Sequence, residues 1–371
     1  MNKVRTLAIA LMALTLFACK KQEPKQTKAA VLSLRIDDAE LRAIEGQIDN
    51  GTKTTITKDV KVIINGGAGR TYTLTSDQIT AAKTAQGCRL EVTDVVTSVD
   101  LVANAEVTND TNIADWQGKG GEAFKTDIPL TATTSTITTT TEGDKTVYKA
   151  ELTPVPPFAR LEVFGKIEPV KNVTNNKCAF ESIEVKEVTI NNYLETRNAT
   201  TRYFTDHNTT LDGFADNPAR KAAMMDAITD KTAFEAGTKA AAYQLFPKKA
   251  NEKSGNYEHI ILKLAIKYSA EAKANGFPDG EQIRYVTIKK FKTAARPSGK
   301  PPVNIPALSF KVGTVYKLNL NGLNDYFKTN EDGTPDPNNP DTTEPESKGK
   351  KELQLIVKPC TWTAQNILPE L

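Results

Sequence analysis

Short runs in which apolar and polar residues alternate recur along most of the chain. The first is Val31–Ile36, and residues 60–64 and 98–104 repeat the pattern before Gly- or Asn-containing turns. Successive side chains of a strand point to opposite faces, so each run predicts a strand with one buried face. Short strands at close spacing are typical of sandwiches, and the chain is therefore predicted to be mainly β.

Three prolines within residues 154–157 separate two groups of these strands. Proline has no N–H to donate and is not found in central strands, so this segment predicts a domain boundary. We predict two tandem β-sandwich domains, residues 43–152 and 153–329. Helices are expected at residues 76–84 and within residues 217–242.

Residues 1–18 have the order of an export signal. Two basic residues precede an apolar run from Leu7 to Phe17, which is too short to span a bilayer as a helix. Leu16–Cys19 looks like the lipobox of bacterial lipoproteins, so Cys19 is predicted to be acylated. An ordinary secretory signal with an incidental cysteine is the alternative. Residues 19–42 then form a lipidated propeptide that contains the first strand.

The alternation returns at the C-terminal end. Residues 330–351 are rich in Asp, Asn and Pro, and they predict a solvated linker or projecting loop. Beyond them, Leu353, Leu355 and Val357 share one face of a predicted strand and Ile356 lies on the other. An apolar tail is unlike the frayed polar ends of most domains. Residues 330–371 are therefore predicted to be a linker followed by a C-terminal strand extension.

Composition narrows the classes of function. The chain has 48 basic and 45 acidic residues, which gives no electrostatic reason to expect a nucleic acid as partner. Its two histidines, His207 and His259, have no ligand-spaced Cys or carboxylate beside them, so no metal site is predicted. No nucleophile with a positioned base emerges. We expect no catalytic residue, no cofactor and no enzymatic activity.

Besides Cys19, the chain has three cysteines: Cys88, Cys178 and Cys360. An odd number in an oxidising compartment permits at most one intramolecular disulfide. We select Cys178 with Cys360 as the pair to test.

The order of these features resembles the fimbrillin family, the shaft and accessory subunits of type V pili, and within it the minor fimbrillins. A segment near the end is similar to the family's terminal Val-x-Val-x-Pro-Trp-Thr signature. Here Cys360 and Thr361 are inserted before Trp362, which shifts the parity of the residues after Pro359. The resemblance rests on Cys19, residues 31–36, Arg42-Ala43, and residues 60–64, 99–104, 158–163, 316–320, 336–341 and 355–363.

The resemblance implies two transthyretin-like β-sandwich domains with a C-terminal strand extension, and a mechanism of strand exchange. The lipoprotein precursor is carried to the outer membrane, and a protease cuts between Arg42 and Ala43. The first strand leaves, and the C-terminal strand of a neighbouring subunit fills the groove, which builds a cell-surface fimbrium. Partners would be other copies of the chain, accessory pilus subunits and surface receptors. The exchanging residues would be Val31, Leu32, Leu34 and Ile36 on one side and Leu353, Leu355, Ile356, Val357 and Trp362 on the other.

Several alternatives stay open on the sequence alone. Arg35 competes with Arg42 as the cleavage site, although it lies inside a predicted strand, and Arg42 is otherwise a surface arginine. Trp362 either plugs an acceptor groove or belongs to the subunit's own core. A tip or accessory adhesin of the same pilus is the nearest alternative function. A carbohydrate-binding surface lipoprotein is another; it predicts an aromatic platform, whereas aromatics are 7% of the chain and do not cluster.

Overall fold

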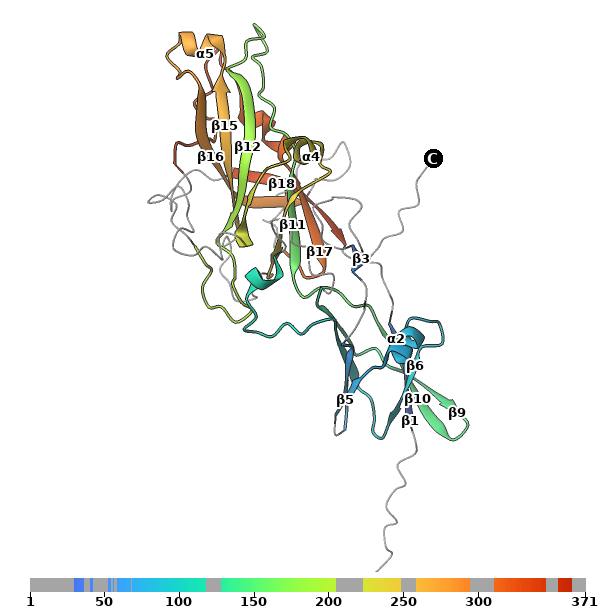
Figure 1. Ribbon diagram of the computed structural model, residues 1–371. Helices are drawn as coiled ribbons and strands as arrows, with labels where there is room; N and C mark the ends of the chain where they lie inside the picture. Colours follow the sequence, from blue (N-terminus) through green and yellow to red (C-terminus); the bar gives the residue numbers. More distant parts are fainter. Residues whose placement is uncertain are drawn as a thin grey trace, which may run out of the picture.

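The structure is a computed structural model that describes residues 30–36, 41–42, 53–54, 56, 59–67, 69–117, 128–204, 223–247, 258–293, 310–344 and 353–361. It is mainly β, as the sequence predicts, and its strands form two groups along an elongated molecule (Figure 1). Every sheet of the described chain lies wholly within residues 30–152 or within residues 159–361. We call these parts the N-lobe and the C-lobe.

The N-lobe contains two four-stranded sheets, with strand orders β6-β1-β10-β9 and β5-β4-β7-β8, and the two-stranded pair β2-β3. All neighbouring strands are antiparallel except β1 and β10, which are parallel. Alternate residues of the strands are buried, as in Val62 and Leu101. The strands are β1 (Ala30–Ile36), β2 (Leu41–Arg42), β3 (Lys53–Thr54), β4 (Lys61–Asn65), β5 (Arg70–Thr73), β6 (Cys88–Val92), β7 (Ser98–Ala103), β8 (Leu130–Thr134), β9 (Thr138–Glu142) and β10 (Lys145–Leu152).

The predicted helix after β5 is confirmed as α2 (Ser76–Ala82). Thr75 and Gln78 form a capping box at its start, since each side chain bonds the other's backbone N–H. Its buried face presents Ile79 and Ala82 to the core. In the segment before β4, Ile56 is only 5% exposed because it packs in the same core.

The C-lobe is built on one eight-stranded sheet of order β13-β12-β15-β16-β18-β17-β11-β14. The C-terminal strand β18 joins β13-β12-β15-β16 to β17-β11-β14. The elements are β11 (Ala159–Phe164), β12 (Phe180–Asn191), β13 (Met225–Ala227), α4 (Lys231–Ala236), β14 (Ala241–Leu245), β15 (His259–Tyr268), α5 (Ala270–Ala274), β16 (Glu281–Thr293), β17 (Thr314–Asn319), the 3₁₀ turn η2 (Leu320–Tyr326) and β18 (Leu353–Thr361).

The helix expected within residues 217–242 is only partly correct. The described part of this segment contains helical residues 223–224, the strand β13 and the short helix α4, and β14 begins at Ala241. Gly237 ends α4 in a left-handed conformation with φ of 74°, which a residue with a side chain rarely adopts. No helix of the described residues is long and apolar enough to cross a bilayer.

Residues 330–344 are not a solvated linker, and that expectation is wrong. Thr329 and Pro335 form a β-bridge, and Arg284 Nε lies 2.7 Å from Asp341 Oδ2. Thr342 forms a further bridge with Tyr285 on β16. The segment buries little apolar area, but its Asp and Asn side chains bond nearby backbone groups and so hold a fixed turn.

The chain passes from the N-lobe to the C-lobe through residues 153–158, and residues 105–117, which follow β7, form a second contact that we call the inter-lobe strap. The strap ends in the 3₁₀ turn η1 (Ile113–Trp116) and crosses to the C-lobe. There the Gln117 side chain pairs with the backbone of Gln244, accepting from its N–H at 2.8 Å and donating to its carbonyl at 2.7 Å. Ile113 N–H donates to the Glu195 carbonyl at 2.7 Å. The strap therefore adds main-chain contacts between the lobes.

Gln117→Leu should weaken the docking of the strap. The substitution removes two hydrogen bonds to the partly buried backbone of Gln244 and a third to the Ile113 carbonyl, each contributing about 1 kcal/mol. We expect a loss of about 2 to 3 kcal/mol in the free energy of unfolding, measured by urea titration. Gln86→Leu, at an exposed position of the N-lobe, is the matched control. Equal urea midpoints for the two variants would show that the Gln117 amide does not help to hold the two lobes together.

Candidate functional site

The strand β1 occupies an interior position in its sheet although it lies near the N-terminal end of the chain. It pairs with β10 at seven residues, from Ala30 to Ile36, and with β6 at five, from Ala30 to Leu34. Both of its backbone edges are therefore used. Without β1, the edges of β6 and β10 that face each other would lose their partners.

The side chains of β1 follow the predicted alternation. Leu32 and Leu34 are fully buried and Ile36 is 1% exposed, whereas Arg35 points outward and pairs with Glu151 at 3.0 Å on the surface. Burying each of these aliphatic side chains contributes about 1.5 to 3 kcal/mol. The exposed ion pair contributes at most about 1 kcal/mol. The strand is thus held by its inward face and its backbone.

On the β6 side of β1, Gly87 and Cys88 are the residues that lie against Leu34. Gly87 has φ of +72°, and a Cβ there would lie 2.7 Å from the Leu34 carbonyl oxygen. Cys88 is paired with Leu34 and is 3% exposed, and this burial raises the pKa of its thiol. The sequence analysis did not identify these residues. The alternation Cys88, Leu90, Val92 was the signal that would have placed a strand here.

Arg42 lies in the short strand β2, which pairs with β3 at two positions, Leu41 with Thr54 and Arg42 with Lys53. Arg35, its competitor, pairs with Glu151 within the seven-residue register of β1 and β10. Proteases bind their substrates in an extended form, so a cut requires the local strand to open. Opening the two residue pairs between β2 and β3 costs less free energy than opening the seven between β1 and β10. Ala43 lies outside the described residues.

Four of the predicted donor residues, Leu353, Leu355, Ile356 and Val357, lie in β18. The structure pairs this strand within its own chain: residues 353–357 run parallel to the end of β16, and residues 358–361 run antiparallel to the start of β17. Each half of β18 thus pairs along one edge in the described structure. Strands β1 and β18 belong to different lobes and are not brought together. Trp362 and Cys19 lie outside the described residues.

The predicted disulfide between Cys178 and Cys360 is wrong. Cys178 has a free thiol whose Sγ lies 3.2 Å from the Phe180 carbonyl oxygen, just before β12. β12 enters the sheet level with Glu281 at one end of β16, whereas β18 begins level with Ile288 and runs farther away. Seven residues of strand already span about 23 Å. A disulfide needs Cα atoms within about 7 Å.

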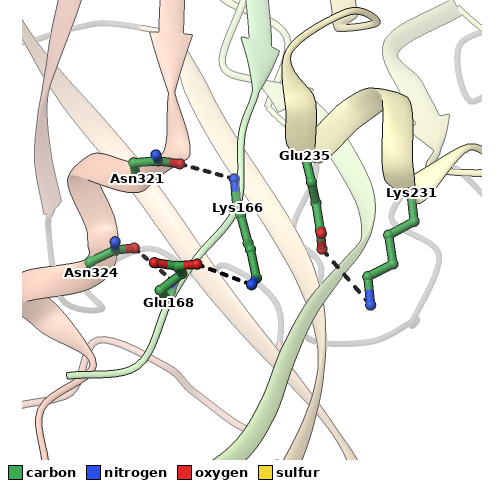
Figure 2. Close-up of polar contacts among 6 residues, drawn as sticks. All are labelled: Lys166, Glu168, Lys231, Glu235, Asn321 and Asn324. Atoms are coloured by element: carbon green, nitrogen blue, oxygen red, sulfur yellow. Dashed lines mark hydrogen bonds and ion pairs between the residues drawn. The ribbon is translucent and has the colours of Figure 1, made fainter. Parts of the chain in front are cut away.

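Where β11 ends, side-chain amides take over the role of a neighbouring strand (Figure 2). Asn321 Oδ1 accepts from the Lys166 N–H at 3.1 Å, and Asn324 Oδ1 accepts from the Glu168 N–H at 2.8 Å. The Lys166 ammonium lies 3.0 Å from Glu168, and this bond raises the pKa of Lys166. These N–H groups are already satisfied, so this edge offers no place for an added strand.

No group of three or more His, Cys, Asp or Glu side chains in the described part of the chain is arranged to hold a metal ion. His259 begins β15, and its ring lies edge-on to Phe204 with centroids 6.1 Å apart. His207 is outside the described residues.

Three solved structures illustrate what this chain is similar to. A putative cell adhesion protein from Parabacteroides distasonis is 13% identical with a TM-score of 0.45, covering 90% of this chain and 99% of that one. A fimbrilin from Porphyromonas gingivalis is 12% identical with a TM-score of 0.43, over 91% of this chain and 98% of that one. The tip fimbrial protein of the same organism is 9% identical with a TM-score of 0.36, over 78% and 94%. Neither protein-family models nor curated protein sequences give a match.

Ser33→Pro should release β1. A proline in the middle of a strand paired on both edges removes a ladder hydrogen bond and leaves its buried partner unsatisfied, which costs about 1 to 3 kcal/mol and corresponds to about 5- to 150-fold in the open population. We expect alkylation of Cys88, followed by peptide mass spectrometry, to accelerate by about that factor, because Cys88 is buried opposite Leu34. Ser33→Ala is the control. An unchanged Cys88 rate in the proline variant would mean that β1 does not cover this residue.

Proposed function

We propose that this chain is a structural subunit of a type V fimbrium, most simply of its shaft, and that it supports adhesion. It is exported as a lipoprotein, anchored through Cys19, cleaved after Arg42 and polymerised by strand exchange. The observation that carries the proposal is the place of β1: a strand near the N-terminus is paired on both edges in the interior of a sheet, and it is followed by an arginine in a weakly paired segment.

The C-terminal strand has the side-chain pattern that the β1 position requires. In β1, aliphatic side chains stand at Leu32, Leu34 and Ile36, with Ser33 and Arg35 between them. In β18, aliphatic residues stand at the same spacing, at 353, 355 and 357, with Gln354 and Ile356 between them. Leu353 of one subunit would therefore take the place of Leu32 in the next. This register gives the inward positions of Leu32, Leu34 and Ile36 an aliphatic side chain, while the place of Ala30 at the end of the groove falls to Lys351.

The β1 position would pair the same donor residues along both edges. In its own sheet, β18 pairs at five positions with β16 and at four with β17, each half along one edge. In the register above, residues 353–357 would meet five positions of β10 and three of β6. About six backbone hydrogen bonds at about 1 kcal/mol each, and three or four buried aliphatic side chains at about 1.5 to 3 kcal/mol each, stabilise the added strand. These gains offset the ordering of the tail.

The contact joins two different surfaces, a tail and a groove, so it is heterologous and continues as a fibre. Acylation at Cys19 holds the precursor at the membrane, and one cut after Arg42 separates the anchor together with β1 from the rest of the chain. Release from the anchor and opening of the groove are then the same event. A subunit cannot accept a donor while its own β1 is in place.

Treatment of the purified precursor with an arginine-specific protease should produce a ladder of oligomers on unheated gels. Arg42→Ala should abolish the ladder, because no other arginine lies between β1 and β4 and β1 then remains linked to the subunit and in its groove. Arg35→Ala should leave the ladder intact, since that substitution removes only an exposed ion pair with Glu151. A protein that is cut after Arg42 but remains monomeric would exclude the shaft role.

Deletion of residues 350–371 should remove the donor and leave the acceptor. The cut, truncated protein is expected to form no ladder by itself but to bind one full-length subunit through its open groove, giving a capped dimer by native mass spectrometry. The uncut truncated protein is the control, because its groove still holds β1. A truncated protein that fails to fold would show instead that the tail belongs to its own C-lobe.

A tip or accessory adhesin is the second candidate, and one observation favours it. The structure places β18 between β16 and β17 of its own chain, which is where a tail that is never donated would remain. The deletion experiment separates the two functions. A carbohydrate-binding protein has less support, since Tyr326, at 36%, is the one aromatic among the large hydrophobic side chains exposed in the described residues.

A further inference from the structure

The chain that leads into β18 is attached to β16 at a second place, before the strand begins. Tyr285 and Thr342 exchange both backbone hydrogen bonds, each 2.9 Å long. Arg284 Nε donates to Asp341 Oδ2 at 2.7 Å, and the side chain of Asp341 is 8% exposed. A charge-assisted hydrogen bond with one partner buried is stronger than a surface ion pair. We call this contact the tail root, defined by residues 284, 285, 341 and 342.

The chain upstream of the tail root is held as well. The Asp336 N–H donates to the Lys328 carbonyl at 3.0 Å, and Asn339 Oδ1 accepts from the Lys328 N–H at 3.2 Å. Lys328 itself forms a parallel bridge with Val170 beyond β11. Residues 328–342 are thus connected to the C-lobe by contacts that do not involve β18.

We propose that Arg284 and Asp341 are positioning residues for the donor strand: they fix the point from which the tail leaves the subunit, so that β18 can move while residues 328–342 stay in place. This inference rests on the proposed function, and its partner is the open β1 groove of a second copy of this chain. The ten residues 343–352 lie between the tail root and β18. Fully extended, they span at most about 33 to 36 Å.

A fixed root with a short connection restricts where the next subunit can lie. The acceptor groove must begin within that distance of Thr342. If the root opens back to Asn339, three more residues join the connection and its reach grows by about 10 Å. Subunits would then still join, but with a longer and more variable spacing, and the local concentration of the donor at the groove would fall.

Hydrogen exchange on the uncut, full-length protein tests the root without polymerisation. Leu355→Pro should raise exchange in residues 353–361, because proline breaks the ladder with β16, and should leave the Tyr285 and Thr342 amides protected. Arg284→Met and Asp341→Asn should each accelerate exchange at Tyr285 and Thr342 by about tenfold, since each removes a charged hydrogen bond. Lys239→Met, in the exposed ion pair with Asp230, is the control and should change neither. Loss of protection at Thr342 in the proline variant would overturn the proposal.

Electron microscopy of fibres assembled from protein cut with the arginine-specific protease gives the second readout. Arg284→Met should lengthen the axial repeat and widen its distribution, and exchange of the charges in Arg284→Asp with Asp341→Arg should restore the wild-type repeat. A repeat that is unchanged in Arg284→Met would also overturn the proposal. If the cut wild-type protein forms no fibres, the proposed function fails, and the exchange data still decide whether the root is independent of β18.

Discussion

The structure depends on one constraint, the need of every buried backbone N–H and C=O for a partner. In the N-lobe this need is met by β1, which bonds β6 on one side and β10 on the other. The inward side chains Leu32 and Leu34 fill the core beneath the same strand. Both requirements, backbone pairing and apolar filling, are specified by alternation and not by particular residues. Any strand with aliphatic residues at alternate positions satisfies them, which is why the position is suited to exchange.

The same constraint operates in the C-lobe, where β18 is the strand proposed to be donated. Its two halves pair with different strands, so its departure would uncover the end of β16 and the start of β17. These are short edges of five and four paired residues. Loss of β18 would divide the eight-stranded sheet but uncover only these short edges, whereas loss of β1 would uncover seven paired residues of β10 and five of β6. In the proposed exchange, this asymmetry would set the direction, from the C-lobe of one molecule to the N-lobe of another.

Alternation in the sequence predicted the existence of β1, β4, β7 and β18, because the period of two reports which face of a strand is buried. It could not predict partners. The location of β18 beside β16, and therefore the distance of Cys360 from Cys178, depends on sheet order, which no local pattern contains. The polar stretch around Asp341 was misread as a linker for a different reason. Individual hydrogen bonds, such as the one from Arg284 to Asp341, hold this stretch in a fixed conformation, and they cannot be predicted from composition.

The inter-lobe strap was also invisible in the sequence, yet the proposed fibre depends on it. In such a fibre, load would enter each subunit at two places: the β1 groove, which holds the tail of one neighbour, and the tail root, from which the subunit's own tail leaves for the next. A pulling force must therefore cross from one lobe to the other. Among the described strand pairs only the bridge of Thr131 with Val155 lies at this junction. Gln117 on Gln244 and Ile113 on Glu195 add backbone contacts there, and Trp116 packs 6.3 Å from Phe158. Several bonds loaded together resist separation better than one, so the strap makes the subunit a single mechanical unit between its two attachment points.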